Sequence, residues 1–129
     1  MKKLTVTVGI PAYNEAANIA FLLEDVLKQR CESFVLEKVV VMSDGSSDET
    51  AAIASRYESS GVRVFDDGQR KGKSARSNEL FDMSPKSDVV LLLDADIVLS
   101  NDSVFEVLVR SIKSGADLVS PELLALPPR

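Results

Sequence analysis

The segment Asp94-Ala95-Asp96 places two carboxylates two positions apart, directly after the apolar run Val89–Leu93. On an extended backbone such residues point to the same side, so the two carboxylates would lie together at a strand end. They repel each other unless a cation lies beside them, and oxygen ligands suit Mg²⁺ or Mn²⁺. Such an ion could also take diphosphate oxygens and stabilise a departing nucleoside diphosphate. The alternative is that both aspartates cap the following turn and face solvent.

Two more polar segments follow apolar runs. In Asp44-Gly45-Ser46, the carboxylate of Asp44 could accept a hydrogen bond from a nucleobase N–H or a ribose hydroxyl; the alternative is an ordinary Asp-Gly turn with a serine cap. In Pro11-Ala12-Tyr13-Asn14-Glu15, Tyr13 offers a flat face to a base and Glu15 falls in the first turn of an expected helix. The alternative there is a tyrosine that packs beside a helix cap.

The densest basic cluster is Arg70-Lys71-Gly72-Lys73 with Arg76, at the start of an expected helix. Cations beside the free N–H groups of a helix start favour an anion site, and a solvated basic loop is the alternative. The stretch Gly68–Ser74 also resembles a P-loop. However, a P-loop has four residues between its glycines, whereas this stretch has three, and Asp67 stands where the first glycine is required. A P-loop-like NTPase is therefore the weaker alternative.

Composition limits the classes of protein. The chain has 129 residues, 45% hydrophobic and 27% charged, which is enough for the core of a single domain. Its net charge of −5 argues against nucleic acid as a partner, and the absence of His excludes imidazole mechanisms. The single cysteine, Cys31, forbids an intrachain disulfide and fits a reducing compartment. No apolar run approaches the ~18 residues of a membrane span, and no signal peptide is recognisable, so a cytoplasmic location is expected.

The elements that must position these segments alternate along the chain. Apolar, Val- and Leu-rich runs predict strands over Leu4–Ile10, Lys38–Met42, Val62–Phe65 and Asp88–Leu93, with a further short one at Asp117–Val119. Helical periodicity and capping residues predict helices over residues 15–31, 47–60, 73–83 and 103–114. This alternation predicts a parallel sheet with helices on both faces, whose ligands bind at the carboxyl ends of the strands. The polar segments stand at those ends.

Taken in order, four segments resemble family 2 glycosyltransferases: Pro11–Glu15, Ser43–Thr50, Lys71–Asn78 and Asp94-Ala95-Asp96. The resemblance extends from about Val6 to Pro121. It implies a GT-A fold, which is a Rossmann-like α/β/α sandwich with a parallel sheet in the strand order 3-2-1-4. It also implies that residues 1–129 form a single domain, the donor-binding half of a truncated catalytic domain. Ser43 departs from the pattern, because many relatives carry a second aspartate there.

The resemblance also implies roles for individual residues. Pro11, Ala12 and Tyr13 would line the base, Glu15 would lie near the ribose, and Asp44 would hold the base edge. Lys73 would approach the donor from the basic loop, and Asp94, with Ala95 beside it, would contact the nucleoside. Asp96 would be the principal ligand of Mn²⁺ or Mg²⁺, with Asp94 as the second carboxylate.

The implied activity is metal-dependent transfer of a sugar from a nucleotide diphosphate sugar, with a UDP-sugar expected, to an unknown acceptor. No residue is assigned as the catalytic base, so the chain alone is expected to be inactive. The alternatives are a non-catalytic nucleotide-binding module and the P-loop-like NTPase. The uncharged run Val89–Leu93 is expected to form an exposed sheet edge. That edge is expected to pair with a second copy as a homodimer or to take up the apolar tail Leu123–Leu126.

Overall fold

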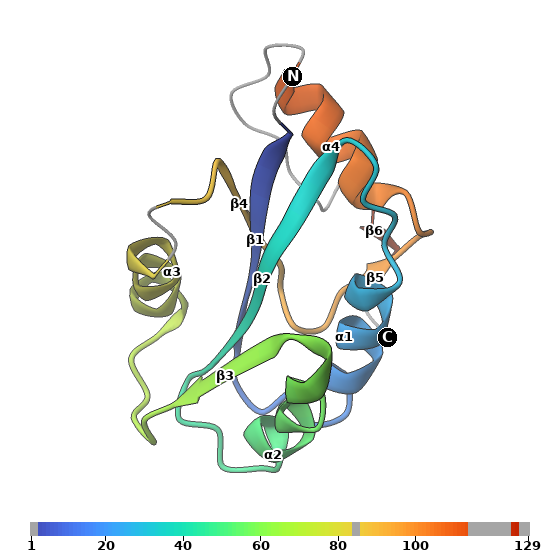
Figure 1. Cartoon of the computed structure of the whole chain (residues 1–129). Coiled ribbons are helices and arrows are strands. Elements are labelled where there is room, and N and C mark those ends of the chain that lie inside the picture. The colour runs from blue at the N-terminus through green and yellow to red at the C-terminus, as the bar shows by residue number, and fades with distance from the viewer. Residues whose placement is uncertain (1–2, 84–85, 114–124, 127–129) are drawn as a thin grey trace.

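A computed structural model describes residues 3–83, 86–113 and 125–126, and its centre is a four-stranded parallel sheet. The strands are β1 (Leu4–Ala12), β2 (Phe34–Ser43), β3 (Val62–Asp66) and β4 (Val89–Leu92). They lie in the order β3-β2-β1-β4, which confirms the order 3-2-1-4 (Figure 1). The carboxyl ends of β1, β2 and β4 therefore meet at one edge of the sheet.

Helices cover both faces of this sheet (Figure 1). On one face lie α1 (Ile19–Leu27), α2 (Thr50–Ser55) with the short 3-10 helix η1 (Glu58–Ser60), and α4 (Val104–Lys113). The other face carries α3 (Lys73–Asp82). Alternate residues of each strand enter opposite cores: Val8 of β1 belongs to the larger core and Val40 of β2 to the smaller one. The expected α/β/α sandwich is confirmed.

The layer formed by α3 lies very close to β1 at Gly9. A Cβ atom built at Gly9 would lie 3.0 Å from Cδ1 of Leu80 on α3 and 3.2 Å from Cδ2 of Leu92 on β4. Gly9 has no side chain, so Leu80 can pack directly on the strand backbone. This contact sets the distance between α3 and the sheet.

Most elements differ from the sequence prediction by a residue or more at an end, and the helix predicted over residues 47–60 is divided into α2 and η1. In α1 and β2, tertiary contacts decide the ends. Helix α1 is shorter than residues 15–31 at both ends, and beyond it the Gln29 amide donates to the backbone oxygen of Asn101 at 2.6 Å. Strand β2 starts at Phe34, four residues before the expected Lys38, because it pairs with β1 along its whole length. At its start, the backbone N–H of Ser33 donates to Glu106 of α4 at 2.8 Å.

A second, two-stranded sheet was not predicted. It pairs β5 (Val98–Leu99) with β6 (Ala125–Leu126) in antiparallel fashion. The apolar tail was one of two expected partners of the edge at β4, the other being a second copy of the chain; its residues Ala125 and Leu126 pair with β5 instead. The expected strand Asp117–Val119 lies outside the residues that the structure describes.

Strand β4 pairs with β1 on one side, and the four-stranded sheet ends there among the strands described. Its pairing with a second copy of the chain stays a prediction. In residues 3–83, 86–113 and 125–126, no helix combines the length and apolar character needed to cross a membrane.

Candidate donor-binding site

A pocket of about 310 Å³ opens at the carboxyl ends of β1, β2 and β4. The residues that line it are Pro11, Ala12, Tyr13, Glu15, Asp44, Arg70, Lys73, Asp94, Ala95 and Asp96. This set contains all nine residues that the sequence assigned to donor or metal binding, and it adds Arg70. The structure thus brings the predicted residues together from three strand ends and one loop, while their individual roles stay predictions.

The loops after β1 and β2 are joined by hydrogen bonds on one side of the pocket. The backbone N–H of Asn14 donates to Oγ of Ser46 at 3.0 Å, and Oδ1 of Asn14 accepts the backbone N–H of Ser47 at 2.7 Å. The backbone N–H of Glu15 donates to Oγ1 of Thr50 at 2.9 Å. Asn14 has a φ of 52° and therefore turns the chain here. These bonds hold Tyr13 and Glu15 in a fixed relation to the end of β2.

Asp44 is 2% exposed and is surrounded by donors from this chain. Its Oδ1 accepts the backbone N–H of Lys71 at 2.7 Å and Nε of Arg76 at 2.9 Å. Its Oδ2 accepts the backbone N–H of Gly72 at 3.0 Å and an Nη1 hydrogen of Arg70. Burial alone would raise the pKa of Asp44, but these four donors outweigh it and lower the pKa to about 2. Asp44 is therefore an anion near neutral pH, and it holds the loop before α3 against the end of β2.

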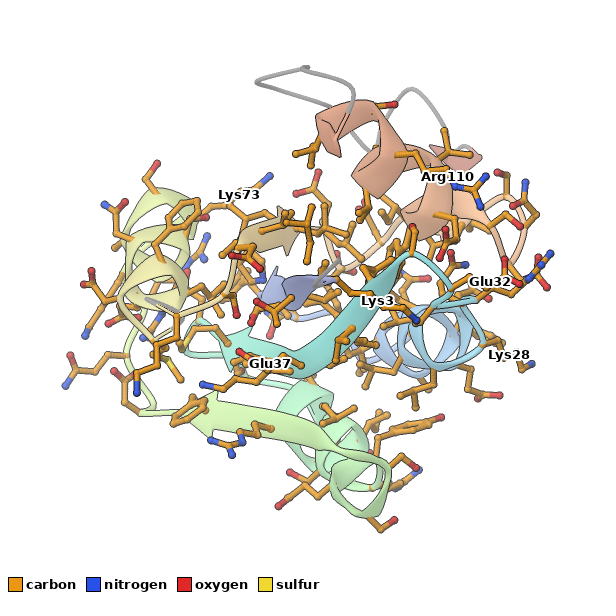
Figure 2. All side chains as sticks on the ribbon, turned by 45° about the horizontal axis from the view of Figure 1, so that its top comes forward. Lys3, Lys28, Glu32, Glu37, Lys73 and Arg110 are labelled. Atoms are coloured by element: carbon orange, nitrogen blue, oxygen red, sulfur yellow. The ribbon has the colours of Figure 1, made fainter. Side chains whose placement is uncertain are left out.

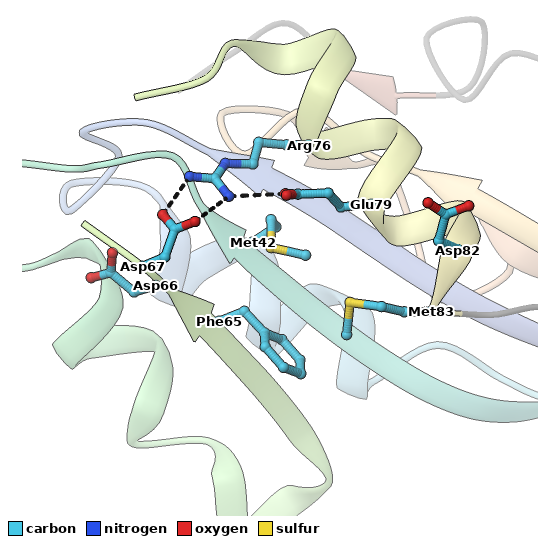
Figure 3. A pocket seen from close by; sticks show the side chains of 8 residues that line it. All are labelled: Met42, Phe65, Asp66, Asp67, Arg76, Glu79, Asp82 and Met83. Atoms are coloured by element: carbon cyan, nitrogen blue, oxygen red, sulfur yellow. Dashed lines mark hydrogen bonds and ion pairs between the residues drawn. The ribbon is translucent and has the colours of Figure 1, made fainter. Parts of the chain in front are cut away.

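Arg76 is the cation at the centre of this arrangement, with a side chain that is 2% exposed. Besides Asp44, its guanidinium contacts Asp67 at 2.7 Å and Glu79 at 2.9 Å, as Figure 3 shows. The hydrogen bonds that Arg76 donates to these carboxylates, above all to Asp67, raise the pKa of Arg76 against the opposing effect of burial. The sequence placed Arg76 in a candidate anion site, but in the structure its guanidinium is bound by the carboxylates of Asp44, Asp67 and Glu79. Its spacing of four residues from the buried Leu80 on one helix face was the signal that it points inward.

Arg70 lies across the part of the pocket that Tyr13 and Asp44 line. Its guanidinium carbon is 3.6 Å from the centroid of the Tyr13 ring, and the same group donates to Asp44. The aromatic face that was predicted to receive a base is therefore in contact with an arginine. No sequence pattern indicated this contact, because Arg70 follows Tyr13 by more than fifty positions.

The two carboxylates after β4 are arranged by a turn and not by an extended strand, so the predicted local geometry was wrong. Strand β4 ends at Leu92, and the backbone N–H of Ile97 donates to the backbone oxygen of Asp94 at 3.2 Å, closing a turn through Ala95 and Asp96. Both carboxylates nevertheless line the same pocket.

Oxygen ligands of this kind fit Mg²⁺ or Mn²⁺. Among the residues described, no cluster of three or more His, Cys, Asp and Glu side chains could itself hold an ion. Two carboxylates suit an ion that completes its shell with water and phosphate oxygens.

Lys73, the first residue of α3, forms an ion pair with Asp94 (Figure 2 labels Lys73 beside α3). Nζ of Lys71 lies 3.3 Å from Oδ2 of Asp67 and 3.2 Å from Oε2 of Glu79. Each cation of the basic cluster thus has a carboxylate partner, while the side chains of Arg70 and Lys73 remain 55% and 65% exposed. The choice between an anion site and a solvated loop stays open for these two residues. The backbone N–H groups of Lys71 and Gly72 donate to Asp44, which leaves them unable to cradle a phosphate and argues against the P-loop alternative.

Comparison with known proteins identifies one family and a shared fold. The family model described as glycosyl transferase family 2 matches residues 7–125. A 4,4'-diaponeurosporenoate glycosyltransferase of Staphylococcus aureus is 43% identical over 72 residues, which cover 54% of this chain and 18% of that protein. The chain therefore spans less than a fifth of the length of this relative.

Solved glycosyltransferases share the fold. Staphylococcus aureus TarS in complex with UDP-GlcNAc superposes with a TM-score of 0.71 and 25% identity over 86% of this chain and 32% of TarS. Glucosyl-3-phosphoglycerate synthase from Mycobacterium tuberculosis, in complex with Mn²⁺, UDP and glucosyl-3-phosphoglycerate, gives 0.67 and 26% identity over 87% of this chain and 40% of the synthase. The mannosyltransferase PcManGT from Pyrobaculum calidifontis, in complex with GDP-Man and Mn²⁺, gives 0.73 at 24% identity, covering 91% of this chain and 34% of PcManGT.

Proposed function

Because the chain belongs to glycosyl transferase family 2, we propose that it binds the nucleoside diphosphate of a nucleotide-sugar donor for metal-dependent sugar transfer to an acceptor. The observation that carries this proposal is the convergence of Tyr13, Asp44, Asp94 and Asp96 on one pocket of about 310 Å³. Ligands of parallel α/β sheets bind at this edge. Two related structures that hold UDP or UDP-GlcNAc support a uridine donor.

The base and ribose belong on the β1 and β2 side of the pocket. Tyr13 supplies a ring face for the base, with Pro11 and Ala12 in the same lining, and Asp44 supplies acceptors for base N–H groups. Glu15 belongs to the same lining and supplies a carboxylate for ribose hydroxyls. The hydrogen bonds between the β1 and β2 loops orient these groups before a ligand arrives.

The diphosphate belongs on the β4 side. Asp96 and Asp94 would hold Mn²⁺ or Mg²⁺, with Ala95 between them in the turn. The ion supplies Lewis-acid stabilisation of the leaving diphosphate when it is bound. Lys73 lies at the same end of the pocket and supplies a cation of this chain beside Asp94. The pocket residues carry no assigned base for the acceptor, so the acceptor and its activation are outside this proposal.

Titration calorimetry with UDP, GDP and ATP, each with and without Mn²⁺, tests the proposal. We expect UDP or GDP to bind in a Mn²⁺-dependent manner, and Asp44→Ala to weaken that binding. Glu58→Ala is the control for the loss of one negative charge, because Glu58 is exposed and lies on η1, outside the pocket. ATP binding that is tighter than UDP and GDP binding, indifferent to Asp44→Ala, and lost in Lys73→Ala would instead indicate the NTPase.

Turnover decides between an enzyme and a binding module. We expect the chain of 129 residues to bind the donor without acceptor-dependent sugar transfer, with slow donor hydrolysis as the only reaction. A general base contributes ~10²–10⁴ in rate, and no pocket residue is assigned to that role. Acceptor-dependent transfer by the purified chain would show that the expectation is wrong. The cytoplasmic location expected from the sequence stays a prediction.

A further inference from the structure

We propose that Arg70 occupies the nucleobase position of the ligand-free pocket and that the base binds only after this side chain leaves. The inference rests on the function proposed above. Its starting point is that one guanidinium engages both groups assigned to the base, the ring of Tyr13 and Oδ2 of Asp44. A nucleobase would use the same two contacts, one for stacking and one for its N–H edge.

The contact with Tyr13 has stacking geometry. The guanidinium carbon of Arg70 lies 3.6 Å from the ring centroid, close enough for both cation–π attraction and planar stacking. Arg70 and Tyr13 both line the pocket, and the guanidinium lies over one face of the Tyr13 ring. A base stacked on that face needs the volume that the guanidinium fills.

The acceptor count at Asp44 leads to the same conclusion. A carboxylate offers about four lone-pair sites, and four donors of this chain take them. Two of these donors are the backbone N–H groups of Lys71 and Gly72, and a third is the buried Arg76. Only Arg70 can leave without breaking the loop or exposing a buried charge. Its departure frees one site on Oδ2 for a base N–H.

Arg70 is also the member of this group that can move. Its side chain is 55% exposed, whereas that of Arg76 is 2% exposed. The backbone of the loop, in contrast, is tightly packed: a Cβ at Gly45 would lie 2.7 Å from the backbone N of Arg70 and from the carbonyl carbon of Gln69. The exchange between the closed and open pocket is therefore a side-chain rotation on a fixed backbone.

When only a fraction of the molecules has an open pocket, the apparent affinity for the base equals the affinity of the open form multiplied by that fraction. If the Arg70 side chain is outside the pocket in only about a tenth of the molecules, then a substitution that removes this side chain should tighten base binding about tenfold. Removal of Arg70 also removes a positive charge, which would weaken the binding of a diphosphate. The uncharged nucleoside separates the two effects, because only occupation of the base position can alter its affinity.

The experiment compares the native chain with Arg70→Ala and Arg63→Ala by titration calorimetry in Mn²⁺. Arg63 is an exposed arginine on β3 outside the donor pocket, so its variant matches the change in net charge. The ligands are UDP and uridine, and GDP and guanosine. We expect Arg70→Ala to bind the nucleoside of the preferred diphosphate about tenfold more tightly than the native chain, and Arg63→Ala to match the native chain.

The outcomes separate this inference from the function on which it rests. Nucleoside binding by Arg70→Ala that equals or falls below that of the native chain overturns the inference alone, since the native chain still binds a diphosphate. Absence of diphosphate binding by the native chain and by Arg70→Ala overturns the proposed function and the inference together.

A second measurement follows Arg70 itself by NMR. In the ligand-free chain, we expect the δ-protons of Arg70 to show an upfield ring-current shift that Tyr13→Leu abolishes. Saturation with the bound diphosphate should return these protons to ordinary values. An upfield shift that persists at saturation would mean that Arg70 and the base occupy the pocket together, and it would overturn the inference.

Discussion

Nε of Arg76 lies 2.9 Å from Oδ1 of Asp44, and the two side chains are 2% and 3% exposed. This buried pair joins the first turn of α3 to the end of β2, on opposite sides of the loop that contains Arg70. The same guanidinium contacts Asp67 and Glu79, so one side chain fixes the geometry of the whole loop. The pair therefore links the stability of the fold to the shape of the pocket.

Replacement of Arg76 should destabilise the chain. Arg76→Met keeps the buried volume but leaves the carboxylate of Asp44 without its buried partner, which typically costs about 3–5 kcal/mol. Chemical denaturation measures the loss, with Arg56→Met as a control at an exposed position. A variant that unfolds within about 1 kcal/mol of the native chain would show that the backbone donors and Arg70 suffice for Asp44.

The pH dependence of stability should report on Asp44. Its pKa is about 2 in the folded chain and 3.8 in the reference state, so the folded chain binds fewer protons between these values. Because the folded pKa is the lower one, the contribution is complete above about pH 4 and is lost as the pH falls toward 2. The free energy of unfolding of the native chain and of Asp44→Asn, measured from pH 6 to pH 2, should converge on acidification. A constant difference across that range would contradict the assignment.

Metal-dependent binding should depend on Asp96. Asp96→Asn should weaken UDP binding in Mn²⁺ at least tenfold, or ~1.4 kcal/mol, because an amide oxygen is a poorer ligand than a carboxylate. Without metal, the native chain and the variant should bind alike. Asp82→Asn at the end of α3 serves as the control outside the pocket. Equal affinities in Mn²⁺ for Asp96→Asn and the native chain would remove Asp96 from the metal site.

Lys73→Ala should have opposite effects on two ligands. The variant loses a cation near the diphosphate, so UDP should bind more weakly, and the loss should be larger at low ionic strength. It also frees Asp94 from its ion pair, so Mn²⁺ alone should bind more tightly. Calorimetry with each ligand at two salt concentrations tests both directions. Lys71→Ala is the matched control, because Lys71 pairs with Asp67 and Glu79 outside the pocket lining.

Self-association through β4 is the last prediction. The four residues of β4 are apolar and uncharged, and its outer edge has no strand partner in the part of the chain that the structure describes. Such an edge favours pairing with a second copy in a symmetric dimer. Light scattering across a dilution series should show a dimer that dissociates. A monomer at high micromolar concentration, with the amides of β4 slow to exchange, would mean that another segment of the same chain covers the edge.

The sequence predicted the parallel sheet because apolar strand-length runs alternate with helical patterns, and the strand order followed from the family resemblance. It predicted the convergence of Tyr13, Asp44 and Asp96, since strand ends in such a sheet meet at one edge. It missed the contact of Arg70 with Tyr13, because the spacing of residues within one segment does not show which side chain of a distant loop will contact that segment in the fold. It also predicted the wrong backbone conformation at Asp94, because β4 ends at Leu92 rather than Leu93 and a turn follows. The β5–β6 pair was missed because each strand has only two residues and its partner lies far along the chain.

The close contact between Gly9 and Leu80 makes donor affinity sensitive to a residue that lines no part of the pocket. A methyl group at position 9 would lie 3.0 Å from Cδ1 of Leu80, so either the Leu80 side chain shifts by a few tenths of an ångström or α3 moves away from the sheet. Helix α3 begins with Lys73 and carries Arg76, so an outward movement would draw both cations away from the aspartates at the strand ends. If α3 moves, Gly9→Ala should weaken nucleotide binding although no pocket residue is substituted. The distance between α3 and the sheet would then influence how tightly the pocket binds a nucleotide.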